Sequence, residues 1–301
     1  MSSIIHPIER KLFLKNGIDQ LRQANADKQK IFFDSHYQFW NVINGPRPGT
    51  LHLIVGAAGS GKSTLLLSNI LLWARKYKIL LILSEEMVVP YLCSIVDIKS
   101  DLKLDDFAED HFYLDKRKLP TNEEIVNNIL PLAELDCQEN MANPDAFEKT
   151  IKGAVDAHNP DIIVYDNFST GVYSEYDLSR ERRGAHFFGK LARDTNKPVI
   201  VAQHTSKKAP TINRIVGMND SEGSNHLIKR AEFLTTFSKF VIQKRIFQIL
   251  TIHKYRGFSG DAMKHNYQFV YQKYKAAGIF LNDIPKSKEQ ISELVKHANS
   301  L

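Results

Sequence analysis

Cysteine and long apolar stretches are both scarce in this chain. Its 301 residues include two cysteines, Cys93 and Cys137, too few for a disulfide framework and without the spacing of a zinc site. The longest apolar run, around residues 65–74, contains Ser68 and Asn69 and falls well short of the roughly 20 residues that a membrane span needs. The first residues, MSSIIHPIERK, lack the apolar core of a secretory signal. We therefore expect a cytoplasmic protein with no membrane partner.

Acidic residues are the minority among the charged ones. Lys and Arg together number 40 and Asp and Glu 34, which gives a net charge of +6 and a pI of about 9.1. This mild basic excess permits a polyanionic partner such as nucleic acid, but it is also common among soluble enzymes. The hydrophobic content of 43% is enough for one sizeable core.

Short apolar runs alternate with segments of helical periodicity along most of the chain. This alternation predicts βαβ units and a mostly parallel twisted sheet flanked by helices, which is an α/β fold. Two later runs around the turn GFSGD predict a C-terminal antiparallel hairpin. The expected strands are 51–55, 79–83, 112–114, 162–165 and 199–203, the expected helices are 62–77, 121–135, 144–157 and 178–194, the hairpin is 246–253 with 267–274, and the polar tail 286–301 is expected to be a weakly packed helix.

A complete phosphate-binding motif, GAAGSGKS, follows the first of these strands and begins a helix. Its glycines can turn successive backbone N–H groups toward one point, and the helix N-terminus adds to this anion site. Lys62 supplies a charge for the β- and γ-phosphates, and the Ser63 hydroxyl is placed to ligate Mg²⁺. The motif predicts binding of ATP with Mg²⁺ by Gly56, Ala57, Ala58, Gly59, Ser60, Gly61, Lys62, Ser63 and Thr64.

Two other expected strands end in carboxylates. Asp166 ends the apolar run IIVYD, and ligands gather at the carboxyl ends of parallel strands, so we expect Asp166 to face the phosphate loop and the metal. Glu85 and Glu86 follow the run ILLIL, and only one of them can point into the site because side chains alternate along a strand. That carboxylate could deprotonate the attacking water.

A third strand ends in Gln203 and His204 and leads into a basic loop. Gln203 could sense the γ-phosphate and pass its presence to this loop, although a polar strand cap explains it equally well. The loop, from Thr205 to about residue 225, carries Lys207, Lys208 and Arg214. These residues could contact a nucleic-acid backbone, and solvated loop charges remain the alternative.

Further along, Lys254 and Arg256 lie one residue apart on an extended segment and therefore project the same way. They could reach a γ-phosphate held by a neighbouring subunit, as an arginine finger does. At the other end of the chain, residues 9–24 have partly helical spacing, and they could pack on their own domain or dock on a neighbour as an arm. We expect residues 1–30 to form this arm, 31–285 the ATPase domain and 286–301 a tail.

Taken in order, the motifs GAAGSGKS, ILSEEM, IIVYDN, VIVAQH and HKYRGFSG resemble those of hexameric replicative helicases of the DnaB type, which have a RecA-like P-loop NTPase core. The segment FWNVINGPRPGTLHLIVG resembles the family's lead-in to the phosphate loop, so the similarity covers roughly residues 31–274. The sequence AAGSGK is closer to the plasmid or phage branches, such as plasmid RepA-type helicases. The resemblance implies that this chain assembles into a homo-oligomeric ring, a hexamer as in the family, and uses ATP hydrolysis to move along single-stranded DNA.

The resemblance also assigns roles to individual residues. It selects Glu86 over Glu85 as the catalytic carboxylate, because the family's glutamate precedes a methionine. Asp166 matches the Walker B position, Gln203 the γ-phosphate sensor, and Lys254 with Arg256 the cationic pair acting in trans. The family's arm before the core docks on a neighbour, which favours that reading of residues 9–24. DNA-binding loops would include Lys207, Lys208 and Arg214 and, as a second set, Arg180, Arg182 and Arg183.

Some features depart from the family pattern. A loader or a primase is a candidate partner. The large N-terminal domain that bacterial replicative helicases use for ring assembly and primase contact is not seen before the core, which counts against primase coupling and replicative duty. Glu85 stands where the family usually has an apolar residue. A recombinase or KaiC-like regulator of the same fold, or a nucleotide-gated loader that unwinds nothing, is the alternative to a replicative helicase.

Overall fold

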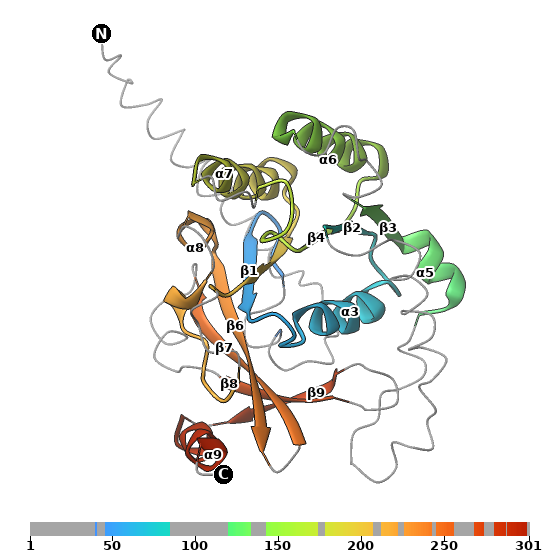
Figure 1. Ribbon diagram of the computed structural model, residues 1–301. Helices are drawn as coiled ribbons and strands as arrows, with labels where there is room; N and C mark the ends of the chain where they lie inside the picture. Colours follow the sequence, from blue (N-terminus) through green and yellow to red (C-terminus); the bar gives the residue numbers. More distant parts are fainter. Residues whose placement is uncertain are drawn as a thin grey trace, which may run out of the picture.

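The computed structural model describes residue 40 and residues 46–84, 120–133, 143–173, 178–206, 212–221, 226–242, 245–255, 268–273, 280–286 and 288–299. These residues form a nine-stranded sheet with the order β3-β2-β4-β5-β1-β6-β7-β8-β9 (Figure 1). The strands are β1 (Leu51–Gly56), β2 (Ile79–Leu83), β3 (Ile129–Ala133), β4 (Ile162–Asp166), β5 (Val199–His204), β6 (Phe233–Ile242), β7 (Arg245–Tyr255), β8 (Gln268–Lys273) and β9 (Phe280–Lys286).

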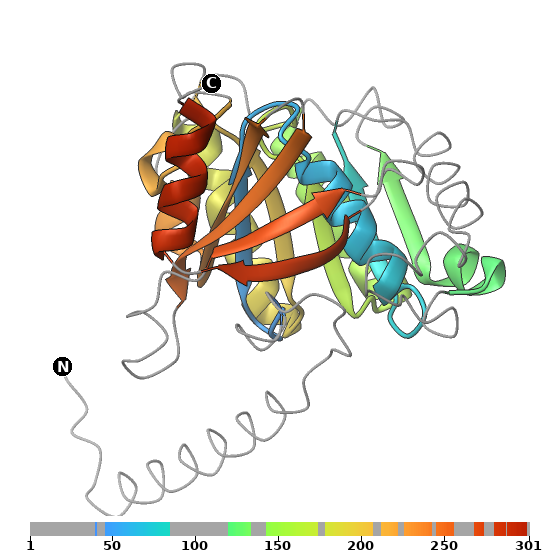
Figure 2. The ribbon, with the colours of Figure 1, turned by 90° about the horizontal axis from the view of Figure 1, so that it is seen from below.

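The sheet has a parallel part and an antiparallel part. Strands β3, β2, β4, β5, β1 and β6 pair in parallel, whereas β7, β8 and β9 continue the sheet with antiparallel pairs. Figure 2 shows the antiparallel strands at one end and β3 at the other. Because β1, β2, β4 and β5 are parallel, their carboxyl ends lie along one edge, where α/β proteins bind ligands.

Helices cover both faces of the sheet (Figure 1). Side chains alternate along each strand: Ile79, Leu81 and Leu83 of β2 pack in the core on the α3 (Lys62–Trp73) side, and Leu80 and Ile82 pack with the helices on the opposite face. That opposite face is covered by α6 (Pro144–His158), α7 (Leu178–Thr195) and the short α8 (His226–Arg230). Strands buried on both faces explain the continuous apolar runs in the sequence.

Local signals set several helix ends. The Thr121 side chain accepts a hydrogen bond from the Glu124 backbone N–H, and the Glu124 carboxylate accepts one from Thr121, so a capping box begins α5 (Asn122–Asn128). Asn143 caps α6, Pro144 occupies its first turn, and Asn159 ends it in the left-handed conformation at φ 45°. These residues fix where α6 begins and ends.

The structure confirms the α/β class and corrects several element predictions. Residues 121–135 do not form one helix: α5 ends at Asn128, and β3 follows directly as a parallel partner of β2. The helix that begins at Lys62 ends at Trp73 instead of extending to Tyr77. The predicted hairpin is present as β7 and β8, but it belongs to a larger antiparallel unit that includes β6 and β9. The expected strand 112–114 and the arm 9–24 lie outside the described residues.

The polar tail forms α9 (Lys288–Asn299), and it packs more closely than expected. Ile291 and Ala298 of this helix are buried against Phe240 of β6 and Ile249 of β7. These contacts tie the tail to the antiparallel part of the sheet. No helix in the described ranges is long and apolar enough to cross a lipid bilayer.

Candidate functional site

The phosphate loop connects β1 to α3 in the conformation that the motif requires. Gly59 and Gly61 have φ angles of 69° and 100°, in the left-handed region that favours glycine. Gly61 is the N-cap of α3 and supplies no side-chain cap, so the first N–H groups of this helix have no capping side chain to bond. The Ser60 hydroxyl in the same loop is buried and has no hydrogen-bond partner among the described residues. Such a cluster of donors fits the phosphates of a nucleotide.

Gly56 is needed for a different reason, which is close approach of the chain. A Cβ atom at this position would lie 2.7 Å from the carbonyl oxygen of Phe237 and 2.8 Å from Oγ of Ser60. The neighbouring β6 backbone therefore leaves room only for glycine where the loop departs from the sheet.

Lys62 is 4% exposed and its ammonium group is held over the loop. Nζ donates to the carbonyl oxygens of Gly56 at 2.7 Å and Ala57 at 3.0 Å, and it lies 3.0 Å from Nδ1 of His204. Because β1 and β5 are neighbours, Gly56 and His204 are directly opposite in the parallel register. Lys62, which the sequence predicts in the site, thus contacts His204, which the sequence did not assign to the site.

His204 connects the phosphate loop to the end of β4. Its Nε2 lies 3.1 Å from Nδ2 of Asn167, the residue after Asp166. The backbone oxygen and nitrogen of Asn167 are bonded to the Ser84 hydroxyl at 2.8 and 2.9 Å, and this hydroxyl lies 2.7 Å from that of Thr170. The ends of β1, β2, β4 and β5 are therefore linked by side chains, as the expected meeting of strand ends requires.

Asp166 and Gln203 are both buried at these strand ends. Asp166 is 6% exposed, and its backbone carbonyl accepts a hydrogen bond from the Ser84 N–H at 3.0 Å. Gln203 is 2% exposed, and its Oε1 accepts a hydrogen bond from Oγ of Ser221 at 3.2 Å. Ser221 lies near the far end of the basic loop, so Gln203 contacts the segment to which it could pass the presence of the γ-phosphate.

A hollow of about 400 Å³ opens beside the phosphate loop. One wall is the loop and the start of α3, and the other is formed by Lys239 of β6 and by Ile246 and Gln248 of β7. Lys239 and Gln248 are directly opposite in the antiparallel register. Sequence reasoning missed this wall because β6 was not predicted and because nothing in the sequence places the predicted strand 246–253 beside the phosphate loop. The lining residues are Ala58, Gly59, Gly61, Lys62, Ser63, Thr64, His204, Lys239, Ile246 and Gln248.

The cations predicted to act beyond the phosphate loop are only partly described. Lys254 is half-buried, and its Nζ donates to the carbonyl oxygens of Ile228 at 2.5 Å and Lys229 at 3.4 Å, at the end of α8 in its own chain. The Arg214 side chain is 56% exposed, and its guanidinium group lies 3.7 Å from Oδ2 of Asp220. Glu85, Glu86, Lys207, Lys208 and Arg256 lie outside the described residues, so their roles stay predictions.

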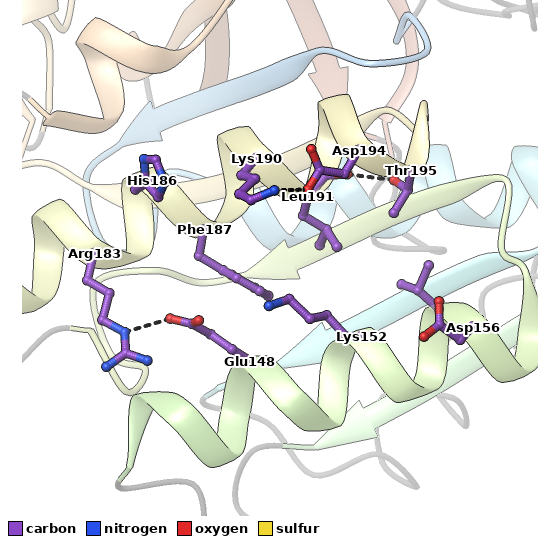
Figure 3. A pocket seen from close by; sticks show the side chains of 11 residues that line it. Glu148, Lys152, Asp156, Arg183, His186, Phe187, Lys190, Leu191, Asp194 and Thr195 are labelled. Carbon is purple, nitrogen blue, oxygen red and sulfur yellow. Dashed lines mark hydrogen bonds and ion pairs between the residues drawn. The ribbon is translucent and has the colours of Figure 1, made fainter.

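A second hollow, of about 450 Å³, lies between α6 and α7 (Figure 3). Its charged side chains are bonded mainly to one another: Arg183 pairs with Glu148 and Asp145, and Lys190 pairs with Asp194. Both carboxylates hold the Arg183 guanidinium protonated and raise its pKa, and the same guanidinium lowers the pKa of Asp145. Arg183, one of the second set of predicted DNA contacts, therefore joins two helices of its own chain.

The metal that the sequence predicts at this site is the Mg²⁺ ion that would accompany ATP. The described residues contain no group of three or more His, Cys, Asp or Glu side chains arranged to hold a metal ion. Nucleotide-bound Mg²⁺ needs fewer protein ligands because phosphates supply the others. The hydroxyl of Ser63 and the carboxylate of Asp166 are the oxygen ligands that the sequence predicts for it.

Comparisons with known proteins bear on the fold. No protein-family model matches the chain, and no curated protein sequence matches it. Among solved structures, it resembles the crystal structure of the RadB recombinase with a TM-score of 0.55 and 18% sequence identity, over 82% of this chain and 96% of that chain. At this identity the likeness concerns the fold alone. Together with the strand order and the phosphate loop, it confirms a RecA-like P-loop core: a mostly parallel sheet flanked by helices, with an antiparallel end.

Proposed function

We propose that this chain binds and hydrolyses ATP with Mg²⁺. The observation that carries the proposal is the placement of Lys62, whose buried ammonium group is held over an uncapped helix N-terminus beside a hollow of about 400 Å³. An ammonium group and a set of orphan N–H donors at one point recognise phosphate. Gly59 and Gly61 adopt the positive φ angles that this loop conformation requires.

Each remaining step of hydrolysis has a candidate residue. Ser63 and Asp166 would hold the Mg²⁺ ion, which neutralises charge on the phosphates when bound. Glu86 would orient and deprotonate the attacking water. Gln203 would transmit the state of the γ-phosphate to the basic loop, and its bond to Ser221 at the far end of that loop supports this role.

We further propose that ATP controls DNA contact and self-association, as in a recombinase, a loader or a nucleotide-gated DNA-binding regulator that does not unwind. The likeness to the RadB recombinase supports this class. Lys207, Lys208 and Arg214 would contact the phosphates of single-stranded DNA, and the exposure of Arg214 is compatible with such a contact.

A hexameric helicase or translocase is the second candidate. The order of the five sequence motifs favours it, since they follow the pattern of DnaB-type helicases from GAAGSGKS to HKYRGFSG. Both candidates share the ATP site and differ in assembly and in what turnover does to DNA. A primase partner would belong to this second candidate alone.

The test is ATP turnover with and without single-stranded DNA, together with the mass of the ATP-bound assembly and a strand-displacement assay. We expect Mg²⁺-dependent turnover that Lys62→Ala abolishes, because the phosphates lose their main cation. Lys152→Ala, on α6 and away from the strand ends, is the matched control and should turn over at the wild-type rate.

The outcomes separate the candidates. Stimulation by DNA with a filament or small assembly and no strand displacement supports the recombinase or regulator. Stimulation with a ring-sized mass and strand displacement supports the helicase. Turnover that survives Lys62→Ala would exclude the proposed ATP site altogether.

A further inference from the structure

Two donor groups lie against the ring of His204, one at each nitrogen. Nδ1 is 3.0 Å from Nζ of Lys62, and Nε2 is 3.1 Å from Nδ2 of Asn167. An ammonium group can only donate, so a hydrogen bond with Lys62 requires Nδ1 without a proton.

The orientation of the Asn167 amide follows from its other contacts. Its Oδ1 accepts the backbone N–H of Ser169 at 2.9 Å and the hydroxyl of Thr170 at 3.3 Å. A backbone N–H cannot accept, so Oδ1 must face it and the NH₂ group must face the His204 ring. A hydrogen bond with Asn167 therefore requires Nε2 without a proton.

One ring cannot satisfy both donors. A neutral imidazole carries a proton on Nδ1 or on Nε2, and a charged one carries a proton on both. The ring accepts from Lys62 in the Nε2–H form and from Asn167 in the Nδ1–H form. The side chain therefore has two alternative states whose balance depends on where the Lys62 ammonium group lies.

We propose that His204 is a tautomer switch set by the phosphates of the bound nucleotide. In the empty site Nδ1 accepts from Lys62 and the proton is on Nε2. When phosphate takes over the ammonium group, Nδ1 carries the proton and donates to a phosphate oxygen, while Nε2 accepts from Asn167. One proton leaves Nε2 and one arrives at Nδ1 through solvent, so no net proton is taken up. The proposal rests on the proposed ATP site.

The switch would transmit occupancy away from the phosphate loop. Asn167 is bonded to Ser84, the last described residue of the segment that continues into Glu85 and Glu86. His204 itself ends β5, directly before the basic loop that contains Lys207 and Lys208. The hydrogen bond that the ring gains at Asn167 is thus connected to the residues that directly precede the expected catalytic carboxylate and the expected DNA loop.

Nitrogen NMR of ¹⁵N-histidine-labelled protein reads the switch directly, since protonated and bare ring nitrogens resonate far apart. The His204 signals are assigned by their loss in His204→Asn. We expect Nδ1 to be unprotonated in the nucleotide-free protein and protonated in the complex with Mg²⁺ and a non-hydrolysable ATP analogue. The same tautomer in both states would overturn the proposal.

A double-mutant cycle supplies a second readout. Asn167→Asp keeps an oxygen for Ser169 and Thr170 but offers a carboxylate to Nε2–H, which locks the empty-site tautomer. We expect it to weaken analogue binding roughly 10-fold, the worth of a hydrogen bond to a charged group. In a His204→Asn background, which has no ring to switch, most of this loss should disappear.

The double-mutant cycle also distinguishes the switch from simple charge repulsion between Asn167→Asp and the phosphates. If the added charge of Asn167→Asp merely repels the phosphates, the loss is the same in both backgrounds and the switch is wrong. Melting temperatures identify any variant that is simply unfolded, in which case the wild-type NMR comparison decides. Failure of the wild-type protein to bind the analogue would instead exclude the proposed function, whereas binding without a change of tautomer would exclude only the switch.

Discussion

His52 of β1 is a buried titratable residue at the centre of an aromatic cluster. It is 1% exposed, its ring stacks on Phe233 at 5.5 Å between centroids, and the edge contact with Trp40 is at 5.1 Å. Burial lowers the pKa of His52 from 6.5 to about 3 because the charged ring would lose its hydration. Burial lowers the pKa of His253 as well.

This residue makes stability depend on pH with a definite sign. Below its unfolded pKa of 6.5, the unfolded chain binds a proton at His52 that the folded chain excludes down to about pH 3. The fold is therefore not penalised by His52 above pH 6.5, and it loses free energy of unfolding as the pH falls below this value because the unfolded chain gains a proton there. We expect the free energy of unfolding to decrease by about 2 kcal/mol from this residue between pH 7 and pH 5.

Urea unfolding of the wild type and of His52→Leu at the two pH values measures this effect. The variant should lose much less stability on acidification, because its side chain has no proton to bind. His186→Gln, a change at an exposed histidine of α7, should retain the wild-type pH dependence. Equal pH dependence in the wild type and His52→Leu would show that His52 accepts a proton in the folded state.

At this scale the sequence predicts residues whose role is local and misses those whose role depends on distant neighbours. The glycines and Lys62 could be identified because one short motif contains both the loop geometry and its charge. The place of His204 depends on β1 pairing with β5 and on Asn167, which directly follows β4 and lies more than 30 residues away along the chain. Its sequence position beside Gln203 did not single it out, and the family resemblance selected Gln203 as the γ-phosphate sensor.

Two glycines inside helices show how the effect of a Gly→Ala substitution on the free energy of unfolding depends on the surroundings of the residue. A Cβ atom on Gly184 of α7 would lie 2.5 Å from Cγ of Tyr173 and 2.7 Å from Cε2 of Phe168, both buried rings. A Cβ atom on Gly153 of α6 would meet nothing within 4 Å. Gly184→Ala should destabilise by about 1–3 kcal/mol through overpacking, and Gly153→Ala should stabilise by about 0.5–1 kcal/mol.

Thermal and chemical unfolding of the two variants provide the comparison. Both changes raise helix propensity equally. The difference between their effects on the free energy of unfolding therefore measures the contact of α7 with Tyr173 and Phe168. If Gly184→Ala is as stable as Gly153→Ala, then α7 does not pack against these rings as the structure has it.

Helices and strands could be predicted from the sequence where the hydrophobic pattern of a segment fits only one kind of element. The five apolar residues of β2, bounded by polar segments, correspond to the strand that was expected. Residues 129–133, ILPLA, were assigned to a helix because they follow the helical pattern of α5 without a glycine, and only pairing with β2 makes them a strand. Strand β6, FLTTFSKFVI, was missed because its threonines, serine and lysine obscure the apolar pattern, although Thr235, Thr236 and Ser238 are buried and hydrogen-bonded.

At the scale of the whole molecule, the sequence predicts an ATP site shared between subunits, to which the neighbour would contribute Lys254 and Arg256. In the described chain Lys254 is already bonded to the end of α8, so we expect Lys254→Met to reduce stability. Arg256 is the better candidate for the finger. Arg256→Ala should leave ATP binding unchanged and reduce kcat by roughly 10³-fold or more, the usual worth of an arginine finger. Wild-type turnover by this variant would exclude the role in trans.

Mixing two inactive variants tests the sharing itself. Lys62→Ala removes the phosphate loop's cation and Arg256→Ala the finger, so neither protein alone has an intact site. In a mixed head-to-tail assembly, a site is intact where an Arg256→Ala subunit supplies the loop and a Lys62→Ala subunit supplies the finger. Random mixing in equal amounts makes about one quarter of the interfaces intact. Turnover should therefore rise toward a quarter of the wild-type rate on mixing, whereas a site completed within one chain would gain nothing.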